Sequence, residues 1–128
     1  MLKSENRLKS EHAFNWVFRH SKPVYSNNLV FRVAKIPARL RGGITTSGKE
    51  SSSPVRFGYI ISSKVIKKAT RRNDIKRKLR RISRELLPRI KPGYDVVVIV
   101  KRDFEYPYEQ EAVSTQFISG LTKTGILE

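Results

Sequence analysis

The side chains best able to do chemistry in this sequence are cations, and most of them lie in one segment. Residues 64–91 hold 13 Lys and Arg residues against only Asp74 and Glu85, in a chain of formal net charge +16. Guanidinium and ammonium groups at this density bind phosphate oxygens, so the partner indicated is a polyanion, above all a nucleic acid. The composition therefore favours a nucleic-acid-binding role over catalysis by the protein's own side chains.

Groups that could catalyse a reaction are scarce. The chain has no cysteine, which excludes thiol nucleophiles, thiolate metal sites and disulfides. His12 and His20 lack a nearby ligand pattern. Four carboxylates precede or open the last predicted helix: Asp103, Glu105, Glu109 and Glu111. They are interpreted as helix caps and solvent-facing charges, so we expect no catalytic residue and no metal ligand in the protein.

One stretch comes close to a nucleotide-binding motif. Residues 43–50 (GITTSGKE) nearly match the phosphate loop G-x-x-x-x-G-K-[ST]. Glu50, however, replaces the hydroxyl that would bind magnesium, and a Ser-Ser-Ser-Pro run follows in place of a helix. Nucleotide hydrolysis is thus a weak alternative, and residues 37–54, rich in Gly, Ser and Thr, are predicted to form a long flexible loop.

The cationic segment must be carried by a helix. At 100° per residue, four apolar side chains fall within about 60° of one another: Ile75, Leu79, Ile82 and Leu86. Five polar side chains share the opposite sector of about 100°: Asn73, Lys76, Arg77, Arg80 and Arg84. We predict a helix over residues 70–87, capped by Thr70 or Asn73, with one face in the core and a basic face outside.

The remaining elements complete an α+β domain over residues 1–128. A helix is predicted from Ser10 to His20, on which Phe14 and Phe18 either fill the core or stack on unpaired bases. Alternation predicts strands at 29–34 and 55–62, and the run 94–101, apolar on both faces, predicts a central strand. Residues 107–121 are predicted to form the last helix. No segment has the length of a membrane span or the apolar run of a signal peptide, so we expect a cytoplasmic protein.

Residues 68–80 (KATRRNDIKRKLR) resemble the signature of the protein subunit of bacterial ribonuclease P, A-x-x-R-N-[basic]-[apolar]-K-R-x-[apolar]-[basic]. The resemblance extends to RLK at 7–9, FNWVF at 14–18, and RFG at 56–58 followed by SK at 63–64. It covers most of the chain outside 37–54 and the last residues.

This resemblance implies an α-β-β-β-α-β-α sandwich with a brief strand near Val24 and Tyr25, a four-stranded sheet and a left-handed crossover between the third and fourth strands. It also implies a ribonucleoprotein that removes the 5′ leader from precursor tRNA endonucleolytically. Its RNA subunit would carry catalysis and hold most of the magnesium. The implied partners are ribonuclease P RNA and precursor tRNA, without a membrane or an obligate protein partner. A ribosomal or other structural RNA-binding protein is the alternative.

Carried over by position, the resemblance implies that seven residues contact the catalytic RNA: Lys64, Lys68, Arg72, Asn73, Lys76, Arg77 and Arg80. We add Arg84, which lies on the basic face of the same predicted helix. Phe14 and Phe18 would line a cleft for the leader, together with Arg32, where the family often has an aromatic residue. Asp74 occupies a position that is usually basic. We predict that it pairs with Lys78 one turn later and weakens RNA binding only modestly.

Overall fold

The computed structural model describes residues 6–35, 55–104 and 106–127. The loop expected at 37–54, including the motif-like residues 43–50, lies outside the described residues. The elements follow in the order α1 (Glu11–Arg19), β1 (Val24–Ser26), β2 (Leu29–Lys35), β3 (Arg56–Ile61), α2 (Ala69–Leu86), the 3₁₀ turn η4 (Leu87–Arg89), β4 (Tyr94–Val100) and α3 (Gln110–Thr124). The expected order of helices and strands is confirmed, including the brief strand β1.

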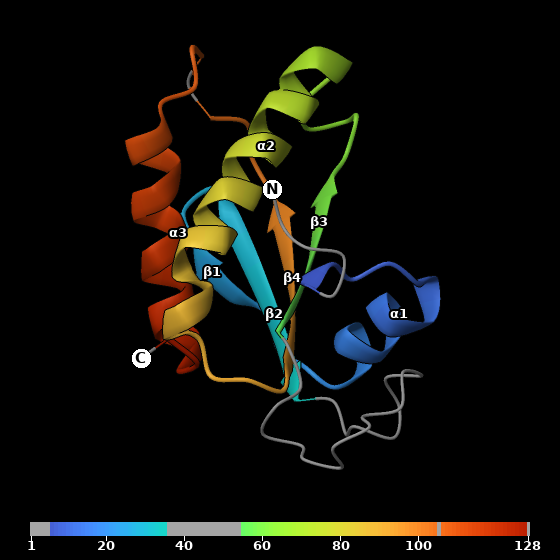
Figure 1. Ribbon diagram of the computed structural model, residues 1–128. Helices are drawn as coiled ribbons and strands as arrows, with labels where there is room; N and C mark the ends of the chain where they lie inside the picture. The colour runs from blue at the N-terminus through green and yellow to red at the C-terminus, as the bar shows by residue number, and fades with distance from the viewer. Residues whose placement is uncertain (1–5, 36–54, 105, 128) are drawn as a thin grey trace.

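The four strands form one mixed sheet in the order β1-β2-β4-β3. β2 pairs antiparallel with β1 and with β4, whereas β3 and β4 run parallel. In Figure 1, α2 lies in front of the sheet and the chain moves from β3 leftward to β4, with both strands pointing up. The crossover is therefore left-handed, against the usual preference and as the resemblance implied.

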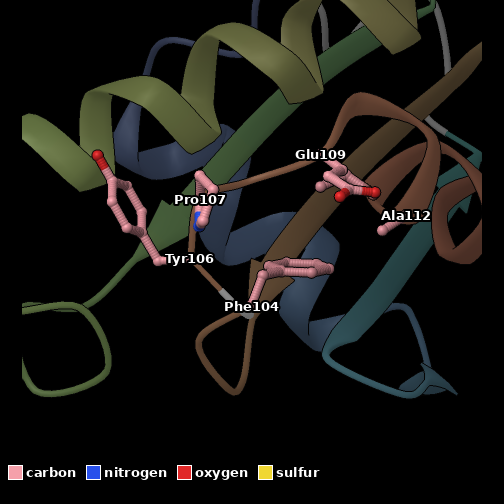
Figure 2. Close-up of a pocket in the computed structure, with 6 residues that line it drawn as sticks. Phe104, Tyr106, Pro107, Glu109 and Ala112 are labelled. Carbon is pink, nitrogen blue, oxygen red and sulfur yellow. The ribbon is translucent and has the colours of Figure 1, made fainter.

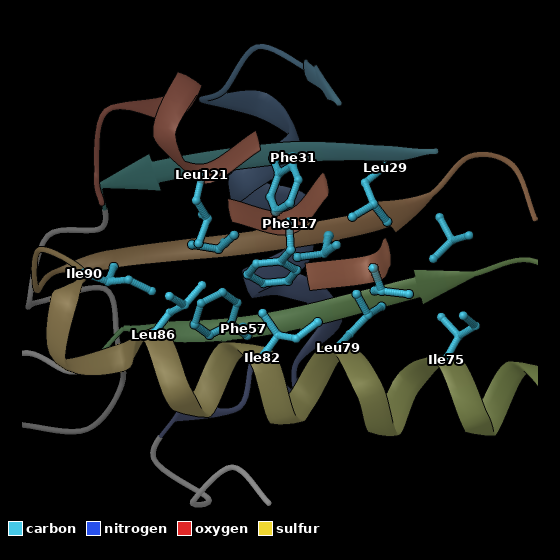
Figure 3. Packing of buried hydrophobic residues seen from close by; sticks show 14 of the residues in the cluster. Leu29, Phe31, Phe57, Ile75, Leu79, Ile82, Leu86, Ile90, Phe117 and Leu121 are labelled. Carbon is cyan, nitrogen blue, oxygen red and sulfur yellow. The ribbon is translucent and has the colours of Figure 1, made fainter. Parts of the chain in front are cut away.

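The main core lies between the sheet and the pair α2 and α3, which cover the same face (Figure 1). The apolar stripe of α2 points into it, as Figure 3 shows, with exposed fractions from 0% at Ile75 to 6% at Leu86. The rings of Phe31, Phe57 and Phe117 fill its centre. Because the stripe is entirely buried, the polar side of α2 must face outward.

α1 packs on the opposite face of the sheet over a smaller cluster that includes Val17 and Val97, both fully buried. Ser10 caps this helix, accepting a 3.0 Å hydrogen bond from the amide of Ala13 as the sequence predicted. Gly58 in β3 allows the close approach of α1, since a Cβ there would overlap the ring of Phe14.

The predicted caps of α2 and the predicted start of α3 are wrong. α2 begins at Ala69 with Lys68 as N-cap and no side-chain cap, so Thr70 and Asn73 lie inside the helix. α3 begins at Gln110 rather than 107 and continues to Thr124, where Gly125 ends it in the left-handed region. The late start of α3 has a tertiary cause, because burial of Phe104 and Tyr108 against the core holds the preceding residues outside the helix.

Candidate nucleic-acid interface

The basic face of α2, defined by Asn73, Lys76, Arg77, Arg80 and Arg84, is presented as the sequence predicted. Asn73, Arg77 and Arg84 are exposed, and Lys76 and Arg80 are half-buried along one flank of the helix. Lys64 and Lys68, which precede the helix, are also exposed. Seven of the eight predicted RNA-contacting side chains therefore keep a polar group at the surface with no hydrogen bond or ion pair to any described residue.

Arg72 differs from the other predicted contacts. Its Nη1 atom donates hydrogen bonds to the carbonyl oxygens of Ile66 and Lys67, at 2.8 and 2.9 Å. These bonds tie the β3–α2 connection to the first turn of the helix, which has no side-chain cap. Arg72 therefore holds the start of α2, and with it the basic face, in place, in addition to contributing a positive charge.

Asp74 makes the predicted ion pair. Its carboxylate accepts a 2.8 Å hydrogen bond from Lys78, four residues later on the flank of α2 away from the basic face. The negative charge at the usually basic position is thereby balanced within the helix.

Beside the basic face, a pocket of about 360 Å³ opens between α1, β3 and α2. Phe14 and Gly58 contribute to its apolar part. Four cations line it, and no described lining residue is acidic: Arg7, Lys9, Lys76 and Arg80. Tyr59 also lines the pocket; its hydroxyl donates to Ser83 at 2.6 Å, and burial raises the pKa of this hydroxyl well above its ordinary value. Neutral aromatic side chains and four cations in one pocket suit a base with its phosphate.

A second pocket, of about 370 Å³, lies farther along the same side of the sheet and includes Phe18, Arg32 and Lys101. Gly58 lines the first pocket and Ile60 the second, and both side-chain positions face α1 from strand β3. The two pockets therefore follow one another along β3. Together they are called the α1–sheet cleft below.

Arg32 is already engaged inside the protein. Its guanidinium carbon lies 4.9 Å from the centre of the Phe18 ring. Its Nη1 donates to the carbonyl oxygens of Phe18 and Ser21, at 3.4 and 3.2 Å. Arg32 thus covers one face of Phe18 and holds the end of α1, while Phe18 remains 36% exposed. The family resemblance implied that both residues belong to the cleft, but it did not indicate their contact.

Sequence reasoning missed four cleft residues. Arg7 and Lys9 were quoted only as part of a motif, and Tyr25 and Lys101 only as parts of strands. Their signal was present but ambiguous, since each lies in or next to a strand or helix whose position is set by tertiary packing. The pairing of Tyr25 with Val30 across β1 and β2 brings Tyr25 to the cleft side.

A third pocket, of about 320 Å³, lies on the other side of the sheet at the β4–α3 connection. Figure 2 shows the Phe104 ring facing Glu109 and Ala112, with Tyr106 extending toward α2. There the guanidinium of Arg71 packs over the Tyr106 ring at 4.0 Å. Among the described residues that line this pocket none is a cation and Glu109 is an anion, so the pocket is unsuited to a phosphate.

Comparison with known proteins was made by sequence and by structure. The family model described as ribonuclease P matches residues 2–125. The ribonuclease P protein component of Cyanothece sp. is 39% identical over 103 residues, covering 79% of each chain. That of Trichormus variabilis is 35% identical over 127 residues, covering 94% of this chain and 89% of the relative. These matches do not favour the ribosomal alternative.

Solved structures show the same fold. The RNase P protein of Staphylococcus aureus aligns with a TM-score of 0.72 at 17% identity, covering 96% of this chain and 98% of that one. The RNase P protein of Thermotoga maritima aligns with a TM-score of 0.67 at 24% identity, covering 91% and 96%. Within the described residues, no helix is long and apolar enough to cross a membrane. The chain belongs to the ribonuclease P protein family, and it is the protein subunit that works with ribonuclease P RNA, in an endoribonuclease complex, in the 5′ processing of tRNA.

Proposed function

We propose that the basic face of α2 binds ribonuclease P RNA while the α1–sheet cleft binds the single-stranded 5′ leader of precursor tRNA. The observation that carries this proposal is the lining of the cleft. Each of its two pockets combines at least one phenylalanine with two or more cations, and no acidic residue is among its described lining residues. The two surfaces are adjacent, because Lys76 and Arg80 belong to both.

A single strand fits the cleft better than a duplex. Unpaired bases expose ring faces that stack on aromatic side chains, whereas paired bases are already stacked on one another. Phe14 rests on Gly58 and Phe18 is held by Arg32, so both rings are fixed before a base arrives. Fixed rings reduce the entropy lost on binding.

We place hydrolysis in the RNA subunit, which would also hold most of the magnesium. Magnesium held there would lower the pKa of bound water and neutralise charge on the phosphate. In the part of the chain that the structure describes, no three His, Cys, Asp or Glu side chains gather as a ligand set. The protein's own residues bind and orient RNA, and the proposal places the complex in the cytoplasm with its substrate.

The test uses Phe14→Ala and Phe18→Ala in the reconstituted ribonucleoprotein. Each variant should bind leader-bearing precursor about 5- to 140-fold more weakly, which corresponds to ~1 to 3 kcal/mol of stacking on one base. Binding of mature tRNA should not change. Tyr106→Ala is the matched control, because this exposed ring lies outside the cleft. Equal losses on precursor and mature tRNA, or no loss on either, would contradict the leader assignment.

A further inference from the structure

Tyr25 is the most exposed large apolar side chain among the described residues of the cleft. Its exposed fraction is 55%, against 36% for Phe18 in the same pocket. Its hydroxyl makes no hydrogen bond to any described residue. An aromatic ring held this far into solvent, inside a pocket, has a face available for a ligand.

The backbone beneath Tyr25 is firmly held. β1 pairs with β2 through Tyr25 and Val30, and Lys123 donates to the Tyr25 carbonyl oxygen at 3.2 Å. The next residue, Ser26, is buried and donates to the carbonyl oxygen of Gln116 in α3 at 2.7 Å. The ring therefore projects from an anchored edge strand rather than from a free turn.

The charges around Tyr25 suit a nucleotide. Lys101 places its ammonium 4.9 Å from the centre of the Tyr25 ring, and its side chain is otherwise exposed. No described residue that lines this pocket is acidic. A base stacked on the ring would bring its phosphate within reach of the flexible Lys101 side chain.

Arg32 cannot take this role as readily. Its guanidinium is bound to two backbone carbonyl oxygens and covers the Phe18 ring, so engaging a base would require breaking these contacts. Tyr25 has no comparable contact to lose, apart from the mobile ammonium of Lys101.

We propose that Tyr25 is a base-stacking residue for the leader, with Lys101 binding the neighbouring phosphate, in the pocket of the α1–sheet cleft that also holds Phe18. This inference rests on the proposed leader function and adds a third ring to it. The Phe14 pocket shares Lys76 and Arg80 with the basic face of α2, whereas no described residue of α2 lines the pocket of Phe18 and Tyr25. With the catalytic RNA bound to that face, as proposed above, Tyr25 would therefore meet leader nucleotides farther from the cleavage site than Phe14 does. Its contribution should therefore appear only when the leader is long enough to reach it.

The experiment measures the affinity of the reconstituted ribonucleoprotein for precursor tRNAs with leaders of increasing length. Tyr25→Leu should weaken binding by about 5- to 140-fold for long leaders and leave the shortest leaders and mature tRNA unchanged. Tyr25→Phe, which keeps the ring, should restore the affinity. Tyr106→Leu is the matched control, since Tyr106 is 54% exposed but lies outside the cleft.

A spectroscopic readout separates stacking from a structural effect. A leader carrying 2-aminopurine at successive positions should lose fluorescence on binding where the base stacks, and Tyr25→Leu should abolish that loss at one distal position. If Phe18→Ala weakens binding of precursor but Tyr25→Leu has no effect at any leader length, the inference about Tyr25 is wrong and the leader cleft stands. If neither variant has an effect, the leader cleft itself is wrong.

Discussion

Replacing Arg77 and Arg84 together by glutamine should remove RNA affinity without removing stability. Both side chains are exposed on the basic face, and neither guanidinium has a hydrogen-bond or ion-pair partner among the described residues. Folding therefore loses no contact. Each arginine that neutralises one phosphate contributes about 0.7 to 0.9 to the slope of log affinity against log salt, so the double variant should lower the slope by about 1.4 to 1.8.

The same slope sets the expected loss of affinity. Extrapolated over the one decade between a 1 M reference and 0.1 M salt, it corresponds to a Kd for ribonuclease P RNA that is about 25- to 60-fold higher. The assay is filter binding across a salt series, with urea unfolding of each variant alongside. Lys91→Gln with Arg102→Gln is the matched control, because these exposed cations lie off α2 and the change in charge is the same. Equal slopes for the two double variants would refute the assignment of the basic face.

Three further changes test single contacts. Gly58→Ala places a Cβ against the ring of Phe14 and should lower the free energy of unfolding by about 1 to 3 kcal/mol in urea titrations; unchanged stability would contradict the packing of α1. Burial raises the pKa of Tyr108 from 10.0 to about 12, so the folded state holds this proton more tightly, and stability present below pH 10 should decline as the pH rises toward 12. Tyr108→Phe should flatten that decline, and an unaltered profile would exclude this cause. Asp74→Arg should tighten RNA binding by less than tenfold, because Asp74 lies off the basic face and is paired with Lys78; a larger gain measured by filter binding would show that the pair does not neutralise it.

The parts of the fold that the sequence predicted are those set by local periodicity. The stripe of α2 from Ile75 to Leu86 and the apolar run of β4 are read directly from the spacing of apolar residues, and both are buried as expected. The left-handed crossover has no local signal and came only from the family resemblance.

The boundaries failed where tertiary contacts outweigh local preference. Thr70 was a reasonable cap by residue type, yet the start of α2 is held by Arg72 through carbonyl groups upstream of it. The start of α3 was misplaced because Phe104 and Tyr108, four residues apart as on a helix, are buried from an irregular segment that precedes Gln110.

The candidate site divides in the same way. The basic face follows from the helical period, but the contact of Arg32 with Phe18 depends on how α1 crosses β2. The ion pair of half-buried Arg56 with buried Asp95 likewise depends on the register between β3 and β4, which places the two residues opposite each other. Neither pairing is encoded by spacing along the chain.

The central claim is that this protein makes cleavage by ribonuclease P depend on the leader. The most direct measurement adds the purified protein to ribonuclease P RNA at low magnesium and follows the cleavage of precursor tRNAs that carry a single leader nucleotide or several. We expect cleavage at the mature 5′ end, with stimulation that grows with leader length and is reduced by Phe18→Ala. Tight binding of the RNA without any stimulation, or stimulation independent of the leader, would contradict it.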